Sequence, residues 1–133
     1  MTDPVEYLEL DDLVELARTL LGDPPPIRDV GLLGSAAARP QTTAFGYDAY
    51  PDMITKAAAL LQSIVNNHAL VDGNKRLGWL ASAVFLELNS VKASQAANDD
   101  VYDLVIWVAS HNPDLGEIVV RLSRVVAPRR KNR

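Results

Sequence analysis

The stretch MITKAAALLQSIVNNHALVDGNKRLGWLASAVFLELN, residues 53–89, contains two apolar helical patterns separated by a polar turn. Apolar residues recur on one helical face over 53–65, which is typical of a helix that packs against a core. Positions 75–89 are apolar almost all round after the first two residues, which predicts a central helix buried on every side. Between these segments, Asp72 and Gly73 predict a turn, and Asn74 is placed to cap the second helix.

Helical patterns also occupy most of the remaining chain. Further helices are expected over 11–22, 27–39, roughly 100–110, and from Pro113 onward. Pro51 suits the first turn of the helix that continues through 53–65. The segment 40–48 is expected to form a loop or a short hairpin. The sequence therefore predicts an all-α fold, a compact bundle of about six helices around a buried central helix, with at most a short hairpin.

Length, composition and charge narrow the possible roles. A chain of 133 residues suits a single domain, predicted over 1–127 and followed by a basic, disordered tail at 128–133. The absence of cysteine excludes a disulfide framework, a cysteine-ligated zinc and a thiol nucleophile. The acidic start has no signal-peptide pattern, and no apolar run approaches the roughly 18 residues of a membrane span. We therefore expect a cytoplasmic protein without membrane association, and its net charge of −4 disfavours direct nucleic-acid binding.

The segment HALVDGNKR, residues 68–76, concentrates polar chemistry at the turn between the two helices. Lys75 and Arg76 fall in the first helical turn, where the helix dipole is positive and acidic residues are preferred. Free backbone N–H groups, a glycine that allows close approach and two cations form an anion site suited to polyphosphate. This unfavourable placement of charge is therefore explained if the helix start binds phosphate.

Two neighbouring side chains complete the parts needed for group transfer. Asp72 could hold Mg²⁺, which proteins usually bind through one or two carboxylates together with phosphate oxygens. His68, as a neutral imidazole, could take the proton from an incoming hydroxyl. Base, metal ligand and phosphate site are what phosphoryl or nucleotidyl transfer requires. The same residues also suit an ordinary turn with a solvated surface, and neither usual phosphate-loop fingerprint is present in the sequence.

HALVDGNKR resembles the signature of the Fic/Doc superfamily, H-x-F-x-[D/E]-[G/A]-N-x-R, and is most similar to the death-on-curing (Doc) branch, where Lys precedes the Arg. The segments 27–51, 56–68 and 82–89 are also similar to Doc-type chains, so the resemblance spans roughly 5–125. It implies a Fic/Doc-like fold that binds ATP and Mg²⁺, with the following roles for residues of this sequence. His68 would be the catalytic base, Asp72 the Mg²⁺ ligand, and Gly73, Asn74, Lys75 and Arg76 the phosphate-binding loop and helix start.

The resemblance also implies a biological role. Doc-type proteins are toxins of type II toxin–antitoxin systems, kinases that transfer the ATP γ-phosphate to a hydroxyl of elongation factor Tu, and they are held by a Phd-like antitoxin. Fic enzymes instead transfer AMP and carry G-N-G-R-x-x-R, whose second glycine and second arginine are replaced here by Lys75 and Trp79. A Doc-like kinase acting on a translation factor is therefore favoured. A Fic-type AMP transferase and a degenerate, non-catalytic antitoxin-binding module are the alternatives.

Several residues depart from the family pattern or lie outside it. Leu70 stands where the motif has Phe, and we expect it to anchor the loop with less bulk. A bulky Leu77 in the first turn could narrow the nucleotide site. The loop that contains Tyr47 and Tyr50 matches the region that forms a target-holding flap in Fic-like proteins. Trp79 and Trp107 are expected to be packing residues. Arg121 and Arg124 are expected to be either solvated surface charges or contacts for an acidic partner.

Overall fold

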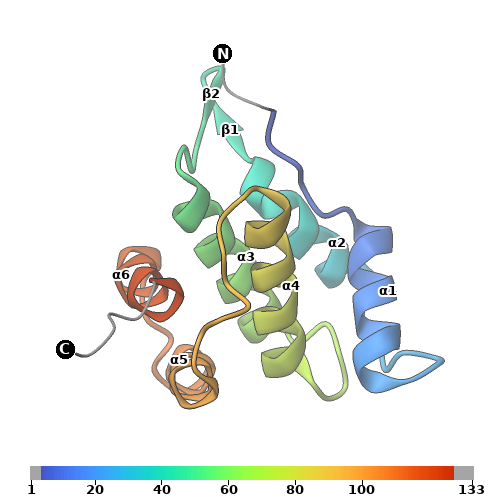
Figure 1. Ribbon diagram of the computed structural model, residues 1–133. Helices are drawn as coiled ribbons and strands as arrows, with labels where there is room; N and C mark the ends of the chain where they lie inside the picture. The colour runs from blue at the N-terminus through green and yellow to red at the C-terminus, as the bar shows by residue number, and fades with distance from the viewer. Residues whose placement is uncertain (1–3, 128–133) are drawn as a thin grey trace.

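The computed structural model describes residues 4–127, which form six α-helices and one small hairpin (Figure 1). The all-α prediction is confirmed, while the predicted tail at 128–133 lies outside the described residues. None of the helices in this part of the chain is long and apolar enough to cross a membrane. The helices are α1 (Leu10–Leu21), α2 (Val30–Ala38), α3 (Met53–Asn67), α4 (Asn74–Leu88), α5 (Asn98–His111) and α6 (Leu115–Val126). The short elements are the 3₁₀ turn η1 (Arg39–Gln41) and the antiparallel strands β1 (Thr43–Ala44) and β2 (Tyr47–Asp48).

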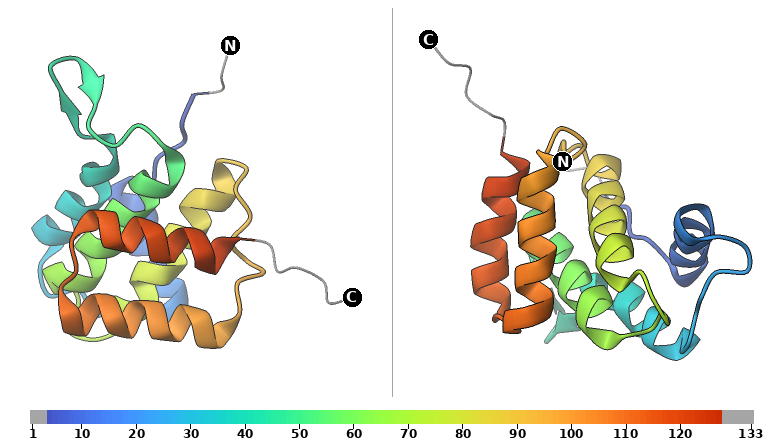
Figure 2. Two further views of the ribbon diagram at one scale, coloured as in Figure 1. Left: turned by 90° about the vertical axis from the view of Figure 1, so that its left-hand side faces the viewer. Right: turned by 90° about the horizontal axis from the view of Figure 1, so that it is seen from below.

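Helices α3 and α4 lie side by side at the centre of the molecule (Figures 1 and 2). Helix α3 packs against α2, η1, α5 and α6, whereas α4 packs against α1 and α5. The central position of α4 is therefore confirmed and is shared with α3. The expectation that α4 is buried on every side was wrong, because the face that carries Trp79, Leu80 and Val84 is only half-buried.

A glycine sets the close approach of the two central helices. A Cβ added at Gly78 would lie 2.7 Å from Cγ2 of Val65 and 3.3 Å from Cδ1 of Leu61, so a larger residue would push α3 and α4 apart. Ser82, which is fully buried one turn later, donates its hydroxyl to the Gly78 carbonyl oxygen at 2.8 Å. The polar residue at this core position is thus satisfied within α4.

Aspartates define where three of the helices begin. Asp29 caps α2 through the N–H of Leu32, Asp52 caps α3 through that of Thr55, and Asp114 caps α6 through that of Glu117. These caps correct three predicted boundaries. Helix α2 begins at Val30 and not at Ile27, and α6 begins at Leu115 and not at Pro113. Pro51 precedes the cap of α3 without belonging to its first turn.

The hairpin β1–β2 projects beside the start of α3 and is anchored there by a buried lysine (Figure 2). Lys56 is only 1 % exposed, and its ammonium donates to Oδ2 of Asp48 at 3.0 Å and to the Tyr50 carbonyl oxygen at 2.6 Å. Burial opposes the charge of Lys56, but the hydrogen bond to Asp48 and the nearby Tyr7 side chain outweigh it and raise the lysine pKa. The hairpin is therefore tied to the bundle by a charged contact.

Candidate functional site

The loop 68–73 joins α3 to α4 and carries the predicted base at its first position. His68 is exposed and ends α3 in the left-handed conformation, with φ 55° and ψ 42°. The next two side chains turn inward, and Leu70 is only 1 % exposed. The expectation that Leu70 anchors the loop in the core is confirmed.

An extended segment, residues 26–29, runs alongside this loop and fixes its backbone. The N–H groups of Arg28 and Asp29 both donate to the Ala69 carbonyl oxygen, at 2.8 and 3.0 Å, and Val71 N–H donates to the Pro26 carbonyl oxygen at 2.8 Å. Ile27 and Leu70 form an isolated antiparallel bridge between the two segments. Sequence analysis placed Ile27 in a helix and did not identify this pairing, because it joins positions about forty residues apart.

Asn74 closes the loop through its side chain. Its amide oxygen accepts the N–H of Leu70 and its amide nitrogen donates to the Leu70 carbonyl oxygen, each at 3.0 Å. The expectation that Asn74 caps α4 was wrong, because the N-cap position belongs to Gly73 and the Asn74 amide is already bonded to Leu70. Asn74 therefore shapes the loop that precedes the helix.

Gly73 occupies a position that admits no side chain without movement of a neighbour. Its φ is 89°, and an added Cβ would lie 2.7 Å from both Cδ atoms of Leu21. Gly73 N–H donates to Oδ1 of Asp72 at 2.9 Å, and the Gly73 carbonyl oxygen accepts the N–H of Leu77 at 2.9 Å, which starts α4. The chain thus turns into α4 in a conformation that glycine adopts readily.

The first turn of α4 carries two positive side chains, and its N-terminal N–H groups are not capped by a side chain of residues 4–127. No side chain among residues 4–127 caps this helix, and its first turn contains no acidic residue. Lys75 and Arg76 are both exposed, and Arg76 Nη2 lies 3.9 Å from Oδ2 of Asp72, at the outer limit of an ion pair. Uncapped N–H groups at the positive end of a helix, next to two cations, favour the binding of an anion.

Asp72 is the one residue of this loop with the chemistry of a Mg²⁺ ligand. Its side chain is 87 % exposed, and Oδ2 makes only the long contact with Arg76. Residues 4–127 contain no cluster of three or more metal-binding side chains. A single exposed carboxylate beside a phosphate site fits a Mg²⁺ ion that is also coordinated by nucleotide phosphates.

An apolar pocket of about 390 Å³ begins beside the two cations and continues along α4. Helices α1, α4 and α5 line it, and Lys75 and Arg76 border it together with Trp79 and Tyr102. A second groove of about 430 Å³ shares Trp79 with this pocket and continues toward Leu88. Trp79 is thus partly a packing residue, as predicted, and also forms the wall of an open groove.

Leu77 does not narrow this pocket. Its side chain is fully buried in the core and does not line the pocket, whereas that of Arg76 is exposed, so the expectation that Leu77 narrows this site was wrong. The helical period explains the outcome, because successive residues of a helix point about 100° apart.

The hairpin does not belong to this site. It lies beside the beginning of α3, whereas loop 68–73 follows the end of that helix, and fifteen helical residues span about 22 Å. Tyr47 is 78 % exposed, and the Tyr50 hydroxyl accepts a hydrogen bond from Arg39 Nε at 3.3 Å. The loop that contains Tyr47 and Tyr50 therefore does not lie over His68, and segment 26–29 occupies the position next to the histidine.

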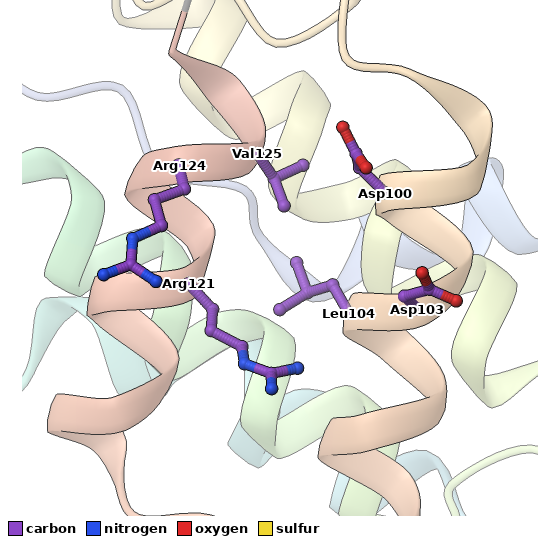
Figure 3. A pocket seen from close by; sticks show the side chains of 6 residues that line it. All are labelled: Asp100, Asp103, Leu104, Arg121, Arg124 and Val125. Carbon is purple, nitrogen blue, oxygen red and sulfur yellow. The ribbon is translucent and has the colours of Figure 1, made fainter.

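A separate charged groove separates α5 from α6 (Figure 3). Arg121 and Arg124 of α6 line it on one side, and Asp100 and Asp103 of α5 line it on the other. The Arg121 guanidinium also lies 4.0 Å from the ring centroid of Trp107. These arginines are thus placed opposite acidic side chains of their own chain, and the groove contains none of the predicted site residues.

Two comparisons with known proteins show the family of this chain. The profile of a family described as "Fic/DOC family" matches residues 7–86. The protein "Toxin Doc" of Mycolicibacterium smegmatis is 46 % identical over 123 residues, which cover 92 % of this chain and 95 % of that protein. The matched span includes segment 26–29, loop 68–73 and most of α4. The chain therefore belongs to the Fic/Doc family.

Proposed function

We propose that this protein is the toxin of a toxin–antitoxin system and acts as a Doc-like kinase that phosphorylates a Ser or Thr hydroxyl of a translation factor. The observation that carries the proposal is the convergence of His68, Asp72, Lys75 and Arg76 on one loop and one uncapped helix start. The similarity to "Toxin Doc" over nearly the whole chain supports the biological role. By resemblance, the target is elongation factor Tu, and the protein would act in the cytoplasm.

The geometry supports the following chemistry. The His68 imidazole would accept the proton of the target hydroxyl as its oxygen attacks the γ-phosphorus of ATP. The bond from that phosphorus to the bridging oxygen would break, and ADP would leave. Lys75, Arg76 and the N–H groups of the first turn of α4 would stabilise the charge on the phosphate oxygens. When bound through Asp72, Mg²⁺ would neutralise part of the same charge.

Lys75 supports γ-phosphate transfer over AMP transfer. It stands where AMP-transferring relatives have a glycine that lets backbone wrap the phosphates, and the second arginine of their motif is replaced by Trp79. Trp79 is half-buried in the wall of the apolar pocket and offers no positive charge to a terminal phosphate. A nucleotide at this helix start would therefore rely on Lys75 and Arg76.

The apolar grooves beside α4 support an antitoxin partner. Together they extend from Lys75 and Arg76 past Trp79 to Leu88, along most of one helix. Such a surface fits a partner segment that folds into an amphipathic helix as it binds. We propose that a Phd-like antitoxin covers these grooves, and that this chain contacts operator DNA only through the antitoxin.

Controlled expression in a bacterial host tests the role as a toxin. The wild-type chain should arrest growth and reduce incorporation of labelled amino acids, while His68→Ala should abolish both effects. His111→Ala is the matched control, because His111 is an exposed histidine at the end of α5, outside the proposed site. Arrest that persists in His68→Ala would contradict catalysis by this residue, and an inert wild-type chain would favour a non-catalytic antitoxin-binding module.

A further inference from the structure

The backbone of His68 is held in a conformation that residues with a Cβ rarely adopt. Its φ of 55° and ψ of 42° belong to the left-handed region. Such a conformation persists only where the surrounding structure fixes it. The imidazole has no hydrogen bond to any of residues 4–127, so the direction in which it points depends on this backbone.

Arg28 makes the contacts that fix this residue. Its guanidinium donates from both Nε, at 3.0 Å, and Nη2 to the His68 carbonyl oxygen. The backbone N–H of Arg28 donates to the carbonyl oxygen of the next residue, Ala69, at 2.8 Å. One arginine therefore binds two successive carbonyl groups at the point where α3 ends, and it satisfies a helix-terminal carbonyl that has no partner within the helix.

The side chain and the backbone of Arg28 have separable effects. Backbone hydrogen bonds join Pro26, Arg28 and Asp29 to positions 69 and 71. A substitution of Arg28 by any residue other than proline leaves these backbone groups in place. Within segment 26–29, only the Arg28 guanidinium bonds to His68. Arg28 is exposed, so a smaller side chain there leaves no cavity in the core. Replacing the side chain should therefore release the histidine while the loop and the fold remain in place.

We propose that Arg28 is a positioning residue, whose guanidinium holds the His68 peptide so that the imidazole faces the target hydroxyl. The inference rests on the proposed function, in which His68 is the base. Base catalysis requires the imidazole within hydrogen-bond reach of the hydroxyl, and small displacements of a reacting group are costly. A released His68 would still be present and able to ionise, but it would be correctly placed for only a fraction of the time.

Steady-state phosphate transfer from γ-labelled ATP to protein in a bacterial translation extract tests the proposal. Arg28→Gln should lower kcat by about 10- to 100-fold, while KM for ATP should change by less than about twofold. Arg28→Lys, which offers a single donor group, should fall between Arg28→Gln and wild type. Arg18→Gln is the matched control, because Arg18 is a partly exposed arginine whose side chain bonds Glu15 and Asp23 and no residue of loop 68–73.

Two further readouts separate positioning from a general loss of structure. Millimolar guanidinium should partly restore kcat to Arg28→Ala, whereas ammonium at the same concentration should not. In histidine-labelled protein, the NMR signal of His68 should shift or broaden in Arg28→Gln while that of His111 stays unchanged. Thermal melting curves of all variants should coincide with that of the wild type.

The outcomes distinguish this inference from the proposed function. If wild type transfers phosphate, His68→Ala does not, and Arg28→Gln is as active as wild type, the positioning role is wrong and the base assignment stands. A rise in KM for ATP at unchanged kcat would make Arg28 a phosphate ligand instead and would also overturn the inference. If His68→Ala retains full transfer, the proposed function itself fails.

Discussion

Gly73 shows how much of the site depends on a single residue. It adopts φ 89°, and an added Cβ would lie 2.7 Å from Leu21 at the end of α1. The left-handed conformation alone costs an L-residue about 1–2 kcal/mol. The contact with Leu21 adds to that cost, because the leucine must move away from α4.

Gly73→Ala should therefore lower the free energy of unfolding by more than the conformational cost alone. Urea unfolding of Gly73→Ala, Leu21→Ala and the double variant separates the two contributions. We expect the substitution to cost about 1–2 kcal/mol in the Leu21→Ala background, where only the backbone strain remains. Equal costs in both backgrounds would show that Leu21 does not limit the site.

Glu87 fixes the loop that follows α4 by a charge-dependent contact. Its Oε2 accepts hydrogen bonds from the N–H groups of Ala93 and Ser94 at 2.8 and 2.9 Å. These bonds, above all that from Ala93, lower the pKa of the Glu87 carboxyl below its ordinary value of 4.5. A lowered folded-state pKa means that the carboxylate stabilises the fold above the unfolded-state pKa. That stabilisation is lost as the pH falls through the lower folded-state value.

Glu87→Gln should therefore melt at a lower temperature than wild type at pH 7. The difference should begin to shrink as the pH falls below 4.5, where the unfolded chain binds the proton, and should disappear below the lower folded-state pKa. Thermal melts at several pH values between 7 and 3 measure this trend. A difference that stays constant over the whole range would mean that the charge of Glu87 is irrelevant to the loop.

At the residue scale, sequence patterns predicted well which residues lie together at the site. They predicted less well which contacts each of these residues makes. His68 to Arg76 are contiguous, so one turn between two helices was enough to place them together. The role of Asn74 was predicted wrongly, because an asparagine at a helix start can cap the helix or bond a preceding loop. The structure shows the second, with its amide bonded to Leu70. Arg28 was missed, because its contact with His68 joins residues forty positions apart.

At the scale of secondary-structure elements, the hairpin and loop 68–73 are separate units of the structure. Lys56 anchors the hairpin through Asp48 and Tyr50 at one end of α3, while segment 26–29 supports loop 68–73 at the other end. Periodicity and turn residues predicted most of these elements within a few residues. They could not predict that segment 26–29 supports loop 68–73, because that pairing joins positions about forty residues apart.

Lys56→Met should loosen the hairpin without affecting the site. Removing the charged donor leaves the hairpin without its bonds to Lys56 and should lower the free energy of unfolding by about 1–3 kcal/mol. Amide hydrogen exchange at Ala44 and Tyr47 should accelerate, while exchange at Leu70 and Val71 should not change. A comparable acceleration at Leu70 would indicate that the two ends of α3 are coupled, contrary to this description.

At the scale of the whole molecule, stability depends on the contact between the two central helices. Gly78→Ala should lower the free energy of unfolding by about 1–3 kcal/mol, because the added methyl group overlaps Val65. Gly34→Ala in α2 is the matched control, since the nearest atom to its Cβ is 3.8 Å away on Leu10. The control should gain about 0.5–1 kcal/mol from the higher helix propensity of alanine. Denaturant unfolding that ranks the two variants in the reverse order would contradict the packing described for α3 and α4.

The sequence also predicted the all-α fold and the central position of α4, because its helical patterns are long and strongly apolar. It could not reveal the open face of that helix, since an apolar stripe that is buried in the core has the same pattern as one that a partner covers. The grooves beside Trp79 and Leu88 therefore became visible only when the positions of α1 and α5 were known.

Phosphate transfer itself tests the central claim most directly. Purified protein is incubated with a bacterial translation extract, Mg²⁺ and either γ-labelled or α-labelled ATP, in parallel with His68→Ala and His111→Ala. We predict that a target protein acquires label from the γ position only, that His68→Ala abolishes the transfer and that His111→Ala preserves it. Label from the α position, label that survives His68→Ala, or no transfer by wild type would contradict a histidine-dependent kinase.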